Sequence, residues 1–225
     1  ATANNLLIVG QQEEVTTSLV ASSMLSLDTQ FPAEQMHMTV LDGTHGDATY
    51  ASLIPEVIEH LHCNAQLVDN REVESAMQIM YCELQRRLKN GAQGAPTHFL
   101  IVNGLHRFRD LRRNEDDYGF SMSDEEKQLT PAQIFAELIK EGPALGIHII
   151  LATDTLTNLN RAVDRQGFRE FDLRVLLQMG NNDSSNLIDS TAASKLGLHR
   201  ALLYSEEAGT IEPFRPYSMP VVRDL

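Results

Sequence analysis

The sequence has little that would suit a membrane-spanning or secreted protein. Its best apolar run, "IHIILA" at residues 147–152, is much shorter than the roughly 20 residues that cross a bilayer. Its first residues are not a basic segment followed by an apolar one, and its two cysteines, Cys63 and Cys82, form no pattern. These absences predict a cytoplasmic domain in a reducing compartment. Because residue 1 is not Met, we expect the 225 residues to be part of a longer chain. A membrane anchor elsewhere in that longer chain stays open.

Basic residues are also few, with 18 Lys and Arg against 31 Asp and Glu and a net charge of −13. This balance argues against a surface that coats nucleic acid, although a local basic patch stays open. Apolar residues make up 42% of the chain, which is the share of a globular protein with a substantial core. Composition therefore allows one large domain or two small ones.

Short apolar runs alternate with helical patterns along the chain. The runs are continuously apolar, which is typical of buried parallel strands with helices on both faces, so we predict an α/β fold with a mostly parallel sheet. The predicted strands are residues 6–10, 38–43, 64–69, 97–104, 146–154, 174–179, 200–206 and 209–215, the last two at one edge. The predicted helices lie between residues 10 and 27 and at 50–61, 71–90 and 131–142. The clearest of them is predicted to bury Val73, Met77, Met80, Leu84 and Leu88.

Residues 105–130 interrupt this alternation as a charged insertion. The segment begins with basic residues, Arg107, Arg109, Arg112 and Arg113, and then becomes acidic. Two interpretations stay open. The first is a solvated, partly mobile insertion, and the second is a lid or a docking element for a partner.

Residues 10–17, "GQQEEVTT", have the layout of a phosphate-binding loop, G-x-x-x-x-G-K-[ST], between a strand and a helix. The candidate nucleotide-binding residues are Gly10, Gln11, Gln12, Glu13, Glu14, Val15, Thr16 and Thr17. Gly10 permits the sharp exit from the strand and Thr17 supplies the hydroxyl that would hold magnesium. However, Thr16 replaces the lysine and Val15 replaces the second glycine. Because Glu13 and Glu14 place carboxylates at the start of the helix, a self-capped turn without a ligand is the alternative interpretation.

The strand "FLIVNG" is the second place where the chemistry of a P-loop motor would lie. In such motors the strand beside the P-loop strand ends in Asp, which binds magnesium, and often Glu, which activates water. Asn103 and Gly104 occupy these two positions here. Asn is a poor magnesium ligand beside a carboxylate, and Gly polarises nothing, so the loss of all these groups argues against hydrolysis.

The C-terminal part of the chain carries a longer series of motifs. These are Gly146-Ile147-His148, Ala152-Thr153, Arg174 before "VLLQM", "DSSNLID" at 183–189 and Leu202-Leu203-Tyr204. In this order, residues 146–206 resemble the end of the motor domain in the FtsK/SpoIIIE family of DNA-translocating ATPases, part of the HerA–FtsK group. Together with residues 4–17 and 97–104 the resemblance covers most of the chain. It implies a RecA-like P-loop fold, ATP with Mg²⁺ as the cofactor, and other ATPase domains of the same or a neighbouring chain, in a ring, as partners.

The departures from that family all concern the chemistry of the motor. They are Thr16 for the lysine, Asn103 and Gly104 for Asp and Glu, Asp154-Thr155 for Gln-Arg, and Ser185 for the Arg of Asp-Ser-Arg, which in the family lies near the nucleotide or the subunit interface. The chain therefore resembles a catalytically degenerate module, comparable to the degenerate ATPase domains of EccC-like type VII secretion motors. Its predicted role is structural, regulatory or substrate-docking in a translocase of DNA or protein. Two alternatives stay open: an active DNA translocase with non-standard residues, and a docking domain whose crevice takes a peptide or side chain.

Three further clusters carry weaker signals. Arg161, Arg165 and Arg169 step by four, so on one helix they would share a face; with Arg174 they are candidates for contact with phosphate or a neighbouring subunit. His60, His62 and Cys63 have the residue types of metal ligands, but no second cluster completes a site, so we predict no metal there. "GTHGDA" at 43–48 lacks the spacing of a dinucleotide-binding loop.

Overall fold

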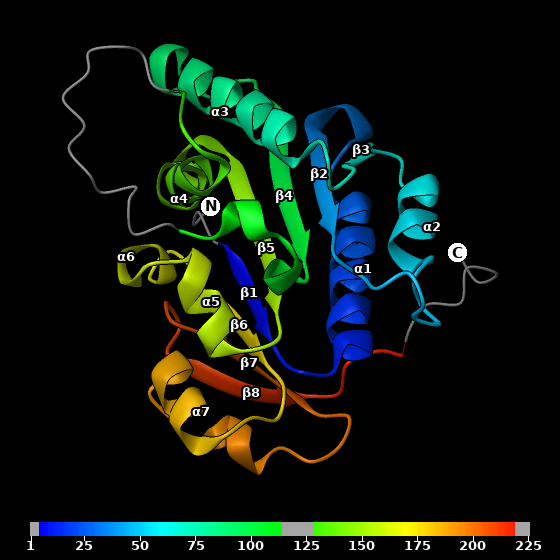
Figure 1. Cartoon of the computed structure of the whole chain (residues 1–225), viewed down its shortest axis with the longest axis vertical. Helices are drawn as coiled ribbons and strands as arrows, with labels where there is room; N and C mark the ends of the chain where they lie inside the picture. Colours follow the sequence, from blue (N-terminus) through cyan, green and yellow to red (C-terminus); the bar gives the residue numbers. More distant parts are fainter. Residues whose placement is uncertain (1–4, 114–127, 219–225) are drawn as a thin grey trace.

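The computed structural model describes residues 5–113 and 128–218, so the acidic half of the predicted insertion, 114–127, lies outside the described residues. The chain forms one eight-stranded sheet with helices on both faces (Figure 1). The strand order is β3-β2-β4-β5-β1-β6-β7-β8. The strands are β1 (Leu6–Val9), β2 (Met36–Asp42), β3 (Asn64–Leu67), β4 (Thr97–Asn103), β5 (Ile147–Thr153), β6 (Leu173–Leu176), β7 (Ala201–Ser205) and β8 (Thr210–Phe214).

The direction of the strands agrees with the sequence prediction. The strands from β3 to β6 in the sheet order all pair in parallel, whereas β7 and β8 add an antiparallel hairpin at the edge. The mostly parallel α/β fold and the edge position of the last two strands are therefore confirmed. Because parallel strands end at the same edge, the segments that follow β1, β2, β4 and β5 meet there.

Two hydrophobic cores lie on the two faces of the sheet. Helices α1 (Glu13–Gln30) and α2 (Leu53–His60) cover one face. The other face is covered by α3 (Val73–Asn90), α4 (Pro131–Glu141), α5 (Leu156–Ala162), α6 (Arg165–Phe168) and α7 (Asn181–Ile188). The last three are short helices that the sequence patterns did not predict. Among the residues that the structure describes, no helix is both long and apolar enough to span a membrane.

The buried face of α3 differs from the prediction at one position. Val73, Met77, Met80 and Leu84 are buried as expected, but Leu88 is 48% exposed, and Arg87 is buried in its stead at 2% exposure. The Arg87 guanidinium is accommodated because it donates to three backbone carbonyls, of Pro96, Leu145 and Gly146, and to the Glu83 carboxylate. A charged side chain can be buried when all its donors are satisfied in this way.

The first part of the predicted insertion is packed rather than solvated. Two 3₁₀ turns, Leu105–Arg107 and Arg109–Leu111, follow β4, and Leu105, Phe108 and Leu111 are 2%, 4% and 0% exposed. Residues 105–113 are therefore anchored by apolar side chains, whereas Arg107, Arg109 and Asp110 are exposed, and the lid or docking interpretation stays a prediction. Because these apolar residues anchor the first turn, it holds His106 and Arg107 at the carboxyl end of the sheet.

Candidate functional site

A small crevice lies where the phosphate-binding loop was predicted. Its lining includes Gly10, Thr16 and Thr17 from the loop and α1, Asn103 and Gly104 after β4, and Thr153 and Asp154 after β5. The structure thus brings the predicted loop and the predicted second motif together. The crevice has a volume of about 10 Å³, which is the space of roughly one water molecule.

Gly10 is required by its neighbours. Its backbone N–H donates to the Thr153 carbonyl at 3.0 Å, and a Cβ on Gly10 would lie 2.5 Å from the side chain of Leu177. The chain then enters α1, whose first turn contains Thr16 and Thr17, both buried. The Thr16 hydroxyl donates to the Glu13 carbonyl at 3.0 Å, so the side chain at the lysine position bonds to its own helix.

Asn103 forms the centre of a polar cluster beneath α1. The strand that ends in Asn103, β4, was expected beside the P-loop strand, β1. This expectation is wrong, because β5 lies between β4 and β1. Nevertheless the Asn103 Nδ2 lies 3.2 Å from Thr17 Oγ1, 2.9 Å from Asp42 Oδ1 and 3.1 Å from Thr44 Oγ1. The Asp42 carboxylate fixes the orientation of the amide, because it only accepts and the reverse orientation would face the amide oxygen to it. The amide nitrogen thus occupies the centre of an oxygen cluster that would suit a cation.

Asp42 is a site residue that the sequence reasoning missed. It ends β2, and its carboxylate accepts hydrogen bonds from the backbone and the hydroxyl of Thr44 at 3.0 and 2.6 Å. The sequence could have predicted Asp42 as a site residue, since "MTVLDG" at 38–43 has the pattern of a buried strand that ends in Asp and Gly. The next residue, Gly43, is also required: a Cβ there would lie 2.9 Å from the Asn103 carbonyl.

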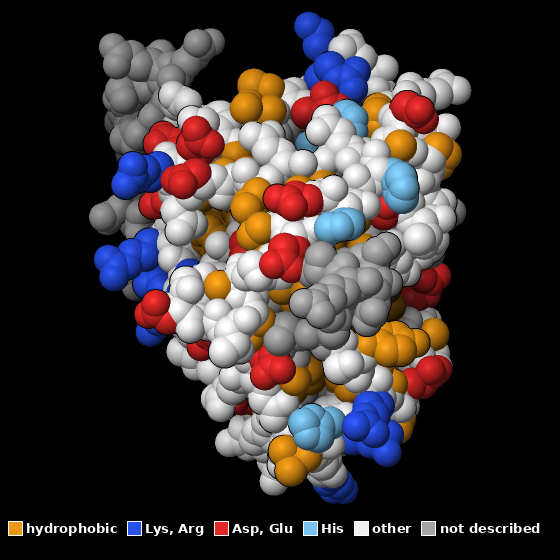
Figure 2. All heavy atoms as spheres, turned by 90° about the vertical axis from the view of Figure 1, so that its right-hand side faces the viewer, with side chains coloured by type: hydrophobic (Ala, Val, Ile, Leu, Met, Phe, Trp, Pro, Cys, Tyr) orange, Lys and Arg blue, Asp and Glu red, His pale blue; other side chains and the backbone are white. Residues whose placement is uncertain are grey.

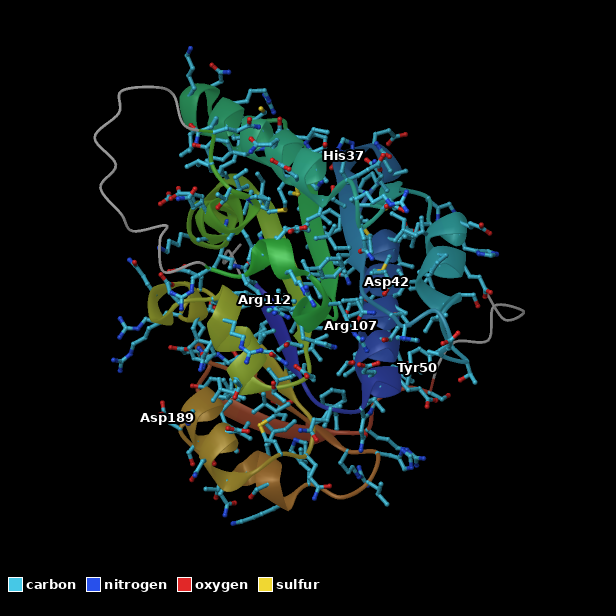
Figure 3. All side chains as sticks on the ribbon, viewed as in Figure 1. His37, Asp42, Tyr50, Arg107, Arg112 and Asp189 are labelled. Carbon is cyan, nitrogen blue, oxygen red and sulfur yellow. The ribbon has the colours of Figure 1, made fainter. Side chains whose placement is uncertain are left out.

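The Glu13 carboxylate lies at the mouth of the crevice. It is 3.3 Å from Arg107 Nη2 and 3.4 Å from His106 Nε2, and the Tyr50 hydroxyl donates to it at 3.5 Å. Figure 3 shows Tyr50 and Arg107 near the end of α1 that follows β1. Burial, and then the negative charge of Glu13, raise the pKa of Tyr50 above its usual value. The start of α1 is not capped by a side chain, because Gln12 at the N-cap makes no side-chain hydrogen bond. The Glu13 carboxylate pairs instead with Arg107, from the segment after β4.

Asp154 lies on the other side of His106, whose Nδ1 is 3.6 Å from the Asp154 carboxylate. Burial raises the pKa of Asp154, but hydrogen bonds from Asn158 and Thr155 and the nearby His106 outweigh it, and the pKa is lowered on balance. The Asn158 amide donates to both carboxylate oxygens, at 2.8 and 3.0 Å. Asp154 is therefore held as an anion by the start of α5 and by the nearby His106.

The remaining loop residues lie in a second, wider cavity outside the crevice. Gln11, Gln12, Glu14 and Val15 line this space of about 740 Å³ together with residues of the C-terminal segment 215–218. Glu13 lines both compartments and lies between them. The predicted nucleotide-binding residues are thus divided, with the carboxylate of Glu13 at the boundary.

The residues present do not fit ATP with Mg²⁺. A triphosphate needs far more space than about 10 Å³, and the crevice lining adds the Glu13 carboxylate, which would repel phosphates. Thr16 supplies no positive charge, and the amide nitrogen of Asn103 occupies the centre of the oxygen cluster. Gly10, the Thr17 hydroxyl and the backbone N–H groups at the start of α1 remain of the usual phosphate site.

The candidate arginines lie elsewhere and do not share one helix. Arg161 is in α5 and Arg165 in α6, because the chain becomes extended at Val163 and Asp164 caps α6 by accepting from the Gly167 N–H at 2.6 Å. The expected single helix face is therefore wrong. Most of these arginines still meet around one groove of about 710 Å³, which we call the α6–α7 groove. Its lining includes Arg113, Arg165, Arg169, Arg174, Ser185 and Tyr204.

The histidine and cysteine cluster gives no metal site. Asp28 accepts from the His62 ring at 2.8 Å and from the backbone of His62 and Cys63, and no set of three or more metal-ligand side chains occurs in residues 5–113 and 128–218. Burial and the nearby Asp28 raise the pKa of Cys63 to about 11. Cys63 is therefore a neutral thiol at ordinary pH.

Comparison with known proteins bears on the fold. No family model matches the sequence, and no curated protein matches it. Among solved structures, the chain is similar to the cytoplasmic domain of the type VII secretion ATPase EccC from Thermomonospora curvata, with 16% identity and a TM-score of 0.69. It is also similar to ATPases 2 and 3 of EccC in complex with a signal sequence peptide (15%, 0.62) and to B204, the DNA-packaging ATPase of Sulfolobus turreted icosahedral virus (15%, 0.60).

The fold is that of these P-loop ATPase domains. The alignments cover 98%, 99% and 96% of this chain, so the similarity extends over the whole sheet. The chain spans only 26% and 39% of the two EccC structures, but 98% of B204. It therefore has the size of one ATPase domain, and the RecA-like fold that the sequence resemblance implied is confirmed.

Proposed function

We propose that this chain is a catalytically degenerate ATPase module of the FtsK/SpoIIIE type, with a structural, regulatory or docking role in a larger translocase. The observation that carries the proposal is the closed crevice: Glu13 pairs with Arg107 and His106 at its mouth, and Asn103 bonds three oxygens within it. Hydrolysis needs positive charge around the phosphates and a carboxylate-held metal. The proposal is supported by Thr16 in place of the lysine, by the Glu13 carboxylate at the mouth and by the Asn103 amide in place of the aspartate.

The similar structures support the part of the proposal that places this chain among other ATPase domains. Two of the similar structures belong to EccC, in which several ATPases occur in one protein, and one of them holds a signal sequence peptide. A module of this size would pack against other ATPase domains of its own or a neighbouring chain, where a non-hydrolysing copy can regulate or dock. In this proposal the docked substrate is a protein rather than DNA.

The charge of the chain favours the protein substrate. Net charge is −13, and on the face of α1 and α2 acidic side chains are scattered while Lys and Arg gather in no single patch (Figure 2). Binding to duplex DNA depends mainly on neutralising phosphates with Lys and Arg. This face offers little for such contacts.

The proposal is tested by phosphate release from ATP by the purified chain, with Mg²⁺, beside the variant Thr17→Ala. We expect no turnover above a protein-free control and no difference between the two proteins. Turnover that Thr17→Ala abolishes, while circular dichroism shows an intact fold, would overturn the proposal and favour an active motor with unusual residues. DNA-stimulated turnover would point to a DNA translocase in particular.

A further inference from the structure

The α6–α7 groove has a rigid floor built around Arg174. This side chain is 5% exposed, and its guanidinium donates to the Leu187 carbonyl at 2.7 Å and to the Glu206 carboxylate. Its Cζ lies 4.2 Å from the centroid of the Phe168 ring and 5.4 Å from that of Tyr204. Stacking between two rings holds the guanidinium in one plane, so the floor offers fixed aromatic surface to a ligand.

The rim of the groove carries two arginines that form no ion pair with the described residues. Arg165 and Arg169 are exposed, and neither side chain has a hydrogen bond or ion pair within the described part of the chain. The carboxylates nearby are largely engaged: Asp164 lies 3.6 Å from Lys140 and caps α6, and Glu206 pairs with Arg174. An acidic chain has thus placed two uncommitted arginines on one side of a groove.

Polar side chains that can bond a peptide backbone lie between the rim and the floor. Asn160, Ser185 and Asn186 line the groove, and their side chains have no hydrogen-bond partner among residues 5–113 and 128–218. Asn amides and Ser hydroxyls both donate and accept, as the backbone of an extended peptide requires. Arg113 adds a third guanidinium at the α5 end, where it donates to the Asn160 carbonyl at 3.0 Å.

We propose that the α6–α7 groove binds an acidic peptide segment that carries a large apolar side chain. The carboxylates of the segment pair with Arg165 and Arg169, and the apolar side chain packs on Phe168 and Tyr204. Asp189 and Glu206 also line the groove (Figure 3 labels Asp189 beside α7), so carboxylates of the segment are expected on the side of Arg165 and Arg169 only. The inference builds on the docking role proposed above, but it does not depend on the state of the crevice.

The test is fluorescence anisotropy with a labelled peptide of alternating Glu and Ser around a central Tyr. The comparison ligands are the same peptide with every Glu replaced by Gln and a labelled DNA duplex. We expect the acidic peptide to bind, the Gln peptide to bind far more weakly, and added salt to weaken binding, since exposed charge pairs are screened. Failure of the acidic peptide to bind at low salt, or a preference for the duplex, overturns the inference.

Two double variants assign the binding to the groove. Arg165→Glu with Arg169→Glu reverses the rim and should weaken binding roughly tenfold or more. The matched control, Arg71→Glu with Lys89→Glu, makes the same charge change at exposed positions before and in α3, far from α6 and α7 (Figure 1). Equal losses in both variants would mean that only net charge matters and would overturn the inference. A titration of the chain with ATP and Mg²⁺, beside the peptide titration, separates the two proposals. Nucleotide binding would contradict only the proposal of a closed crevice, and absence of peptide binding would contradict only the proposal of a peptide site in the groove.

Discussion

The crevice and the α6–α7 groove use their polar side chains in opposite ways. In the crevice, Asn103, Asp42 and Glu13 each bond to other side chains of the same chain, and the space left is about 10 Å³. In the groove, which measures about 710 Å³, the side chains of Arg165 and Arg169 bond to no described residue. The first region lies where the fold usually binds its ligand, and the second does not.

This difference indicates where the chain has kept the capacity to bind. Polar groups that are satisfied internally gain little from a ligand, because binding would first break the existing bonds. Exposed groups without partners have no such cost. The chain therefore retains the framework of a P-loop domain, and under the two proposals above its ligand binds in the groove and not in the crevice.

The largest effect is expected for Asn103→Asp, which tests whether the amide takes the place of a cation. The new carboxylate would face Asp42, where Nδ2 now lies 2.9 Å from Oδ1. Two buried like charges should lower the free energy of unfolding by about 3 kcal/mol, and millimolar Mg²⁺ should restore much of it, because carboxylates and hydroxyls are its preferred ligands. Thermal unfolding with and without Mg²⁺ measures both.

Asn103→Ala is the matched control for this variant. It also loses the bonds to Thr17 and Asp42 and should be destabilised, but without a response to Mg²⁺. If Asn103→Asp is as stable as the wild type in the absence of metal, or ignores Mg²⁺ as Asn103→Ala does, the account of this cluster is wrong.

A smaller effect is expected from opening the crevice with Glu13→Ala and Thr16→Lys together. The first change removes the carboxylate that lies between the two cavities, and the second returns the missing positive charge. The double variant should gain stabilisation by ATP, about 2.7 kcal/mol where the ligand reaches 100 times its dissociation constant. The matched variant Glu14→Ala with Thr16→Lys keeps the Glu13–Arg107 pair and should gain much less. Equal gains in both would show that Glu13 does not block the site.

The smallest effect on stability is expected for two carboxylates, Asp154 at the crevice and Asp172 beside the groove. The pKa of Asp154 in the crevice is lowered, so the charge stabilises the fold above its ordinary pKa of 3.8, and this stability is lost as the pH falls through the folded value. The pKa of Asp172, beside the groove, is raised by burial and by Glu206 and Glu207, so its charge destabilises the fold above the raised value.

Replacement by Asn should therefore have opposite signs in the two places. At pH 7, Asp154→Asn should lower the free energy of unfolding and Asp172→Asn should raise it, each by about 1 kcal/mol or less. Both differences should shrink when urea unfolding is repeated near pH 4. Changes of the same sign at pH 7 would mean that the two carboxylates do not differ as described.

Much of the fold could be predicted from the sequence, because continuous apolar runs and long periodic helices are strong signals. All eight strands and helices α1 to α4 correspond to predicted segments. Helices α5, α6 and α7 have seven, four and eight residues, too few for a helical period to stand out. The even spacing of Arg161, Arg165 and Arg169 therefore suggested one helix where the chain forms two.

The candidate site was predicted in part for the same kind of reason. Gly10, Thr17 and Asn103 meet in the crevice because their positions follow from strand order in a parallel sheet. Arg107 could not be paired with Glu13 in advance, since they are 94 residues apart and the segment of Arg107 looked solvated. Ser185, expected near the nucleotide or the subunit interface, lies in the groove because α7 packs beside β6.

The central claim, that the crevice is closed to nucleotide, is tested most directly by thermal unfolding of the wild-type chain with millimolar ATP, with and without Mg²⁺. The account predicts an unchanged melting temperature in both conditions, because the crevice is small and Glu13 and Asn103 are already bonded within the chain. A melting temperature that rises with ATP, and rises further with Mg²⁺, would contradict it.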